Sequence, residues 1–116
     1  MANDTTKYSL PHHDLIAYRV ACDLLVAVVQ AGIRDRGLKD QALRAAKSVC
    51  LNIAEANGRD TDADRRRVFA IARGEASEAA AAVEIAALAK ECAREDSYRV
   101  QQLGGRVVAL LSGLMR

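Results

Sequence analysis

The sequence predicts an all-α protein, an up-down-up-down antiparallel four-helix bundle. Apolar residues recur with the 3.6-residue period of an α-helix in four segments, and no segment alternates with the period of two that marks a strand. The single proline, Pro11, lies near the start of the chain, so no proline interrupts a later helix. The connections between the four segments are short, and short connections favour antiparallel neighbours.

Length and composition limit the size of the core. A chain of 116 residues supports one domain. Hydrophobic residues make up 51% of the chain and aromatic residues only 3%, so the core must consist mainly of Ala, Val, Leu and Ile. We expect a flexible N-terminal tail at residues 1–11 and a four-helix bundle domain at residues 12–116. The net charge of +2 does not require a nucleic-acid partner, so any electrostatic argument depends on local patches.

The first helix is predicted from about residue 12 to about residue 34. Its apolar residues form two neighbouring stripes. The main stripe contains Leu15, Tyr18, Cys22, Leu25, Val29 and Ile33, and the second contains Ala17, Ala21, Leu24 and Val28. An apolar band this wide exceeds what one packing partner needs, which predicts association with another subunit. A short turn is expected at Asp35-Arg36-Gly37.

The second helix, residues 41–57 with some extension at its start, carries a polar stripe. At about 100° per residue, six polar side chains fall within roughly a quarter of the helix circumference. They are Gln41, Arg44, Ser48, Asn52, Glu55 and Arg59. We interpret this stripe as structural: Glu55 and Arg59 have the spacing of an ion pair, and Glu55 can accept hydrogen bonds from amides at the start of the next helix. Asn57-Gly58 predicts the helix end, because both residues tolerate the left-handed conformation.

Two further helices follow. Thr61 and Asp64 resemble a capping box, so the third helix is predicted from Thr61 to about Cys92. On this helix, Phe69 is expected to face the core of the bundle, together with Ala72, Ala76, Val83 and Ala87. Asp96 or Ser97 is expected to cap the fourth helix. Within that helix, Gly104-Gly105 indicates a close-packed or flexible spot.

The sequence lacks the residue patterns that several kinds of metal, catalytic and phosphate-binding sites require. A di-iron bundle needs Glu-x-x-His pairs, and the only histidines, His12 and His13, lie at the entry to the first helix. No Cys or His spacing matches a zinc site, no nucleophile lies in a catalytic motif, and no glycine-rich phosphate loop is present. We therefore predict a protein that is not an enzyme and that has no metal, no cofactor and no small-molecule substrate.

The sequence also predicts a cytoplasmic location. Cys22, Cys50 and Cys92 are odd in number and widely spaced, and we expect them to be buried free thiols. The polar start of the chain lacks the apolar run of a signal peptide. No apolar stretch is long enough to span a bilayer, so no membrane partner is expected.

One cluster of charge is a candidate nucleic-acid site. It consists of five arginines around the turn between the second and third helices and along the third helix: Arg59, Arg65, Arg66, Arg67 and Arg73. Guanidinium groups can hold phosphates, and binding would be directed at the backbone because aromatic residues for base stacking are scarce. Asp60, Asp62 and Asp64 are interleaved with these arginines, so the alternative is a solvated end whose charges pair with one another.

A second polar stripe is predicted on the third helix. It is basic at one end and acidic at the other, and it contains Arg66, Arg73, Ser77, Glu84 and Glu91. The stripe is either a plain solvent-exposed face or a surface for head-to-tail pairing between subunits of opposite local charge.

With these residues placed, the chain resembles the four-helix-bundle family encoded by intervening sequences in bacterial large-subunit ribosomal RNA genes. That family includes the accessory variability determinant of diversity-generating retroelements. The resemblance covers residues 14–114 and is strongest where the family has a Q-x-x-R-A-A-x-S-I…N-I-A-E-G-x-G-R run. The matching positions here are Leu38, Gln41, Arg44-Ala45-Ala46, Ser48-Val49, Asn52-Ile53-Ala54-Glu55 and Gly58-Arg59, followed by Phe69, Ile71-Ala72, Gly74 and Glu78.

The resemblance implies a homo-oligomer, typically a pentameric ring of bundles, without known enzymatic activity. In the retroelement branch the ring binds nucleic acid and a reverse transcriptase. Two functions therefore remain open. One is an oligomeric scaffold that contacts RNA or a ribonucleoprotein through the arginine-rich bundle end. The other is a purely structural oligomer, or an adaptor for a protein partner, without nucleic-acid binding.

Overall fold

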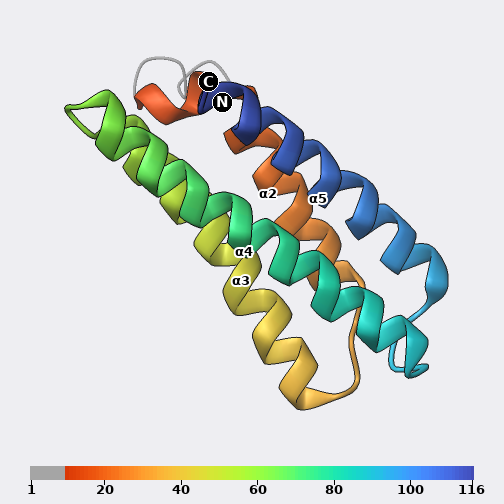
Figure 1. Cartoon of the computed structure of the whole chain (residues 1–116). Coiled ribbons are helices and arrows are strands. Elements are labelled where there is room, and N and C mark those ends of the chain that lie inside the picture. Colours follow the sequence, from red (N-terminus) through yellow and green to blue (C-terminus); the bar gives the residue numbers. More distant parts are fainter. Residues whose placement is uncertain (1–9) are drawn as a thin grey trace.

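The computed structural model describes residues 10–116 and confirms the all-α class. Four α-helices follow a short 3-10 helix, η1 (Pro11–Asp14): α2 (Ile16–Gln30), α3 (Arg36–Asn57), α4 (Asp62–Leu88) and α5 (Arg94–Leu114) (Figure 1). No strand occurs in this part of the chain. Most of the predicted tail, residues 1–9, lies outside the described residues, while Pro11 already belongs to η1.

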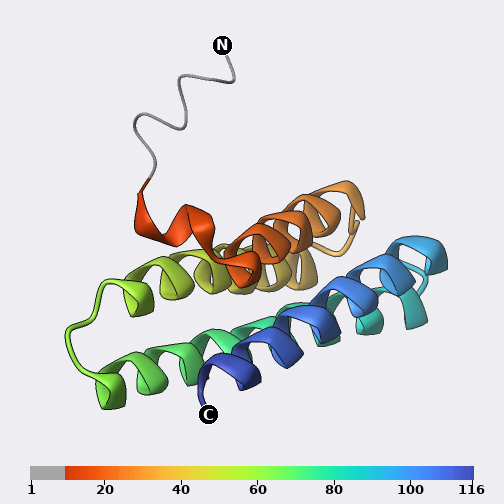
Figure 2. The same ribbon diagram turned by 90° about the horizontal axis from the view of Figure 1, so that it is seen from above.

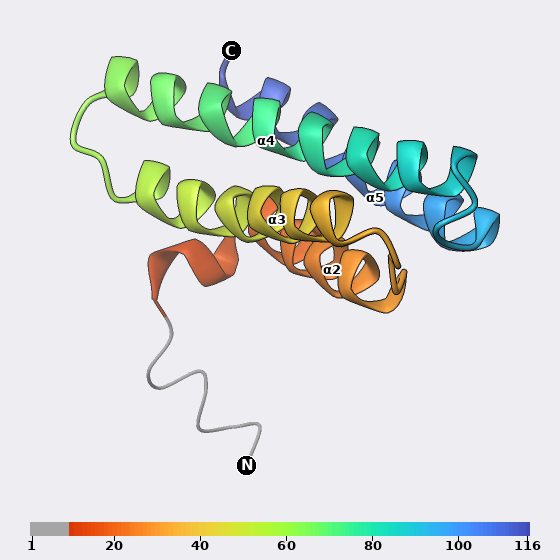
Figure 3. The ribbon, with the colours of Figure 1, turned by 90° about the horizontal axis from the view of Figure 1, so that it is seen from below.

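The helices pack in two layers. Figure 2 shows α2 beside α3 in one layer and α4 beside α5 in the other. The closest association joins α3 to α4, and α4 also packs on α5. The same neighbours are visible from below in Figure 3, where α3 and α4 lie side by side along most of their length.

The first long helix is shorter than predicted at both ends. It begins at Ile16, because residues 11–14 form the 3-10 helix, and it ends at Gln30 instead of near residue 34. Gly32 has a φ of 59°, a left-handed conformation that terminates the helix. The second predicted stripe, Ala17, Ala21, Leu24 and Val28, is buried. In the main stripe only Ile33 is buried, and Val29 remains 59% exposed.

The predicted turn at residues 35–37 is the start of α3. The carboxylate of Asp35 accepts a hydrogen bond from the Gly37 amide at 3.2 Å, so Asp35 caps a helix that begins at Arg36. The predicted end at Asn57 is confirmed, although the reason given for it is wrong. Gly58 has a φ of −92°, so α3 ends without a left-handed residue.

The start of α4 is confirmed and its end is earlier than predicted. The hydroxyl of Thr61 accepts a hydrogen bond from the Asp64 amide at 3.1 Å. The helix ends at Leu88 rather than near Cys92, because Lys90 is left-handed with a φ of 63°. The amide of Glu91 donates to the carbonyl of Ala86 at 2.7 Å and the amide of Lys90 to that of Ala87 at 3.0 Å. This pair of bonds is a Schellman motif, usually built on glycine.

Helix α5 starts before either predicted cap. Ala93 precedes its first residue, Arg94, and no side chain caps it. Asp96 therefore lies in the first turn, where a carboxylate favours the helix dipole, and Ser97 is buried. Gly104 is buried against α4, and a Cβ atom there would meet the Cβ of Ala80 at 3.2 Å. Close packing thus explains Gly104, whereas Gly105 has open space.

The core is built mainly from alanine and valine. Phe69 is 4% exposed and lies among fully buried Ala72, Ala76 and Val83, as predicted, while Ala87 is only half-buried. Three of the bulkiest fully buried side chains, Leu24, Ile53 and Leu111, come from α2, α3 and α5.

The left-handed lysine predicts a stabilising substitution. Lys90→Gly should raise the free energy of unfolding by about 0.5–1 kcal/mol, because glycine adopts this conformation without a Cβ clash. The matched control is Lys39→Gly inside α3, which should lower the free energy by about 1 kcal/mol through helix propensity. Urea denaturation followed by circular dichroism measures both, and a destabilised Lys90→Gly variant would contradict the prediction.

Candidate nucleic-acid interface

The five candidate arginines start at one end of the bundle. Arg59 lies in the turn after α3, and Arg65, Arg66 and Arg67 lie in the first turns of α4. Arg73 is two turns further along α4. The capped start of α4 fixes this segment, because the Thr61 hydroxyl holds the amide of Asp64.

Arg59 joins the end of α3 to the start of α4. Its guanidinium pairs with Glu55, the predicted partner four residues earlier, and with Asp64 at 3.2 Å. The first amides of α4 were also predicted to donate to Glu55, but the amide of Asp64 donates to the Thr61 hydroxyl instead. These two carboxylates raise the pKa of Arg59, with the Glu55 hydrogen bond as the largest cause. Arg59 therefore has a structural role, because both ion pairs lie within the chain.

Arg65 and Arg67 are also engaged within the chain. Arg65 bonds to Asp62 at 2.7 Å and donates to the backbone carbonyl of Arg59, again at 2.7 Å. Arg67 pairs with Asp64 at 2.9 Å. Hydrogen bonds from Arg65 and Arg67 lower the pKa values of Asp62 and Asp64 respectively.

Arg66 and Arg73 differ from the other three arginines. Arg66 is exposed and makes no ion pair or side-chain hydrogen bond within residues 10–116. Arg73 is half-buried and bonds to the hydroxyl of Ser112 on α5 at 3.1 Å. The cluster predicted from sequence is therefore mostly paired, with Arg66 as its available member.

The fold adds one arginine that sequence analysis missed. Arg116 follows the end of α5, and with Arg65 and Arg66 it lines a shallow hollow of about 180 Å³ beside Asp62. No local sequence pattern indicates this position. Arg116 reaches the site because the order of the helices returns the end of α5 to the start of α4 (Figure 1).

The polar stripe of α3 faces α4 along much of its length. Arg44 pairs with Glu78 of α4 at 3.3 Å, and the amide of Asn52 donates to the Ser48 hydroxyl at 3.0 Å. Gln41 is exposed. With Glu55 and Arg59, the stripe forms a set of side-chain bonds, and two of them, Arg44 with Glu78 and Arg59 with Asp64, cross to α4.

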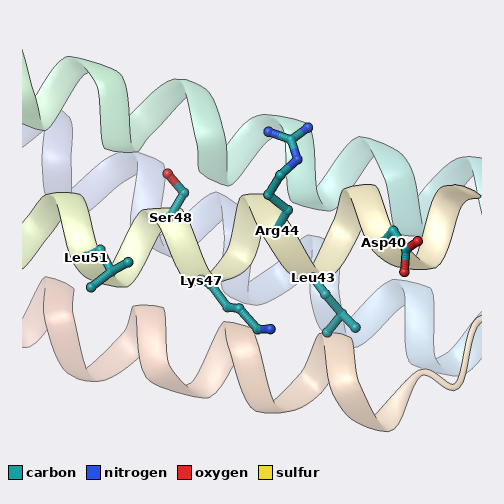
Figure 4. Close-up of a pocket in the computed structure, with 6 residues that line it drawn as sticks. All are labelled: Asp40, Leu43, Arg44, Lys47, Ser48 and Leu51. Carbon is teal, nitrogen blue, oxygen red and sulfur yellow. The ribbon is translucent and has the colours of Figure 1, made fainter.

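A hollow of about 410 Å³ beside this stripe offers no chemistry of its own. Figure 4 shows its six lining residues, Asp40, Leu43, Arg44, Lys47, Ser48 and Leu51. All six come from α3, so the hollow is an open surface rather than an enclosed site. Its arginine, Arg44, is already paired with Glu78.

The three cysteines are free, as predicted, but half-buried rather than fully buried. Burial, followed by the neighbouring Cys22, raises the pKa of the Cys50 thiol to about 12. Burial also raises the pKa of Cys92. Because the thiolate is the nucleophilic form, these two thiols are poorly reactive at neutral pH.

Between residues 10 and 116, no three His, Cys, Asp or Glu side chains gather in a way that could hold a metal ion. In the same range, no helix is both long and apolar enough to cross a membrane.

A known protein family matches most of the chain. The family model described as 23S rRNA-intervening sequence protein matches residues 13–113, a stretch that contains all four helices except the last residue of α5. No curated protein matches the chain.

The pairing of Asp64 predicts a pH dependence of stability. Because the folded state lowers the pKa of Asp64, its contribution is fully present above the ordinary value of about 3.9 and is lost as pH falls through the folded pKa. Asp64→Asn should therefore lower the melting temperature at pH 7, and the difference from wild type should shrink below about pH 4. Asp60→Asn, at an exposed position without an ion pair in the described chain, is the control. A difference between Asp64→Asn and wild type that is constant from pH 7 to pH 3 would refute the assignment.

Proposed function

We propose that this chain, which belongs to the 23S rRNA-intervening sequence protein family, is a non-enzymatic scaffold module that contacts the RNA backbone through its arginine-rich end. The four helices form an up-down-up-down bundle, and bundles assemble into a homo-oligomeric ring, with a pentamer favoured by the family resemblance. The protein acts in the cytoplasm, without a cofactor and without a small-molecule substrate.

The observation that carries this proposal is the position of Arg66. It is exposed, it has no ion-pair partner in residues 10–116, and it shares a hollow with Arg65 and Arg116. A guanidinium free of internal partners can bind a phosphate without first breaking an ion pair. Arg67 remains exposed enough to join it, because its pair with Asp64 lies at the surface.

One subunit offers only a weak RNA site. Asp62 lies beside the same hollow and cancels part of its positive potential. A ring would repeat the site, and several weak sites on one strand gain avidity without any new contact. Binding should show little sequence preference, because no base-stacking element accompanies the arginines.

The internal ion pairs support the second candidate function. Arg59, Arg65 and Arg67 are each held by an acidic side chain of the same subunit. If these pairs persist in the assembly, the protein is a structural oligomer or an adaptor for a protein partner. RNA binding distinguishes the two functions.

The test replaces Arg66 and Arg67 with glutamine and leaves Arg65 intact, because Arg65 holds the turn through the Arg59 carbonyl. We expect the wild-type protein to bind labelled single-stranded and structured RNA at low salt, with affinity falling steeply as salt rises. The double variant should lose about tenfold in affinity at low salt. Fluorescence anisotropy measures binding.

The matched control is Arg99→Gln with Arg106→Gln, which removes the same charge from exposed positions on α5. This control should retain most of the binding, and both double variants should keep the helical circular dichroism signal. Absence of binding by the wild type at low salt, or equal losses in both double variants, would favour the structural or adaptor function.

A further inference from the structure

The outward side of α4 is largely apolar although no helix of the described chain covers it. Ile85 is 51% exposed and Leu88 is 79% exposed. Towards the start of the helix, the same side carries a row of small side chains, at Ala63, Ala70, Gly74, Ser77 and Ala81. Figure 1 shows α4 passing in front of α3, and no other described helix lies over its near side. A helix that is apolar on both its inner and outer sides usually has a partner on each.

Gly74 adds an independent observation. It lies inside α4, where glycine costs about 1 kcal/mol relative to alanine. A Cβ atom at this position would meet nothing within 4 Å, so packing inside the chain does not require glycine. This differs from Gly104, whose Cβ would press on Ala80. Close approach of a helix from outside the chain would explain the absence of a side chain at Gly74.

The charges beside this surface are self-complementary. Arg66 and Glu84 are separated by about five helical turns, or about 27 Å, so they lie on the same side of α4. Both are exposed, and neither forms an ion pair within residues 10–116. Their midpoint falls beside Gly74. A second α4 laid antiparallel across this midpoint would therefore place its Glu84 opposite Arg66, and its Arg66 opposite Glu84.

We propose that α4 packs antiparallel against α4 of a second copy of this chain, about a two-fold axis near residue 75. The register that pairs Arg66 with Glu84 also brings small residues of the two copies to within one residue of being opposite, Ala70 near Ala81 and Gly74 near Ser77. With the same one-residue stagger, the exposed Leu88 of each copy lies near Ala63 of the other, so a large apolar side chain meets a small one. A two-fold contact uses the same patch on both subunits, as this arrangement requires.

This contact goes beyond the proposed RNA-binding ring. A ring of five closes through two different patches on each subunit, whereas the α4 contact joins copies in pairs. Each α4 contact therefore doubles whatever unit the other faces form, a single bundle or a ring. Arg66 belongs to both proposed surfaces, so RNA and the α4 contact compete for this guanidinium, whereas Glu84 belongs only to the α4 contact.

Charge reversal with complementation tests the contact. Arg66→Glu and Glu84→Arg should each weaken self-association at least about tenfold, because like charges then face one another, so sedimentation equilibrium in the micromolar range shows half the wild-type particle mass. Mixing the two variants should restore the full mass, because opposite charges again meet at both ends of a contact that joins one chain of each kind. Arg99→Glu, an exposed reversal on α5, should leave the mass unchanged.

Gly74→Leu tests the close approach without using charge. Its side chain has open space in the single chain and leucine is a better helix former than glycine, so at low concentration the variant should keep its helical signal and gain melting temperature, while its particle mass halves. Glu84→Arg should still bind RNA, because Glu84 lies outside the arginine-rich end. Loss of the α4 contact with RNA binding retained therefore separates this proposal from the preceding one. A wild-type mass of 12.5 kDa at high micromolar concentration would overturn the α4 contact. A particle unaffected by either single reversal, or a mixture that fails to recover the full mass, would also overturn it.

Discussion

The close packing of α3 on α4, two helices rich in buried alanine, sets the geometry on which the rest of the molecule depends. Ala42, Ala45 and Ala46 on α3, and Ala72, Ala76 and Ala79 on α4, are all fully buried. Such short side chains let two helices run close together over many turns, and α3 and α4 make the most extensive contact in the fold. The same packing buries little apolar area per residue, so the hydrophobic contribution from one bundle is small for its length.

Polar contacts at the turn between α3 and α4 stabilise the fold in addition to the alanine-rich core. The Thr61 cap and the pairs of Arg59 with Glu55 and Asp64 fix the angle at which α4 leaves the turn. Each pair is partly exposed and individually weak, but together they define one conformation of the turn. As a consequence, most arginines of the arginine-rich end form ion pairs within the same chain. Positive charge available to an outside partner is concentrated at Arg66 and Arg116, on the side where the end of α5 meets the start of α4.

A single bundle buries little apolar area, and this gives a reason for the apolar side chains that remain on its surface. Val29 on α2, Leu51 on α3 and Leu88 on α4 are each more than half exposed, on different helices. A monomer that needed no partner would gain solubility from polar residues at these positions. On α4 the apolar surface coincides with a glycine that internal packing does not require and with unpaired charges of opposite sign. The other two positions lack such accompanying features.

The sequence by itself determined the helical class, the end of α3 at Asn57, the Thr61 cap and the Glu55–Arg59 pair, because each depends on residues within one turn or on a simple periodicity. It failed at the end of α2 and the end of α4, where Gly32 and Lys90 adopt left-handed conformations within otherwise helical patterns. Only the tertiary structure decided which stripe of α2 is buried, since both stripes are apolar and the choice depends on where α3 and α5 lie. It also decided the state of Arg59, because the turn geometry brings Asp64 within 3.2 Å of its guanidinium, whereas the pairs of Arg65 with Asp62 and of Arg67 with Asp64 follow the i,i+3 spacing of α4. Arg116 joined the site for the same reason, because proximity across the bundle is a property of helix order rather than of local sequence.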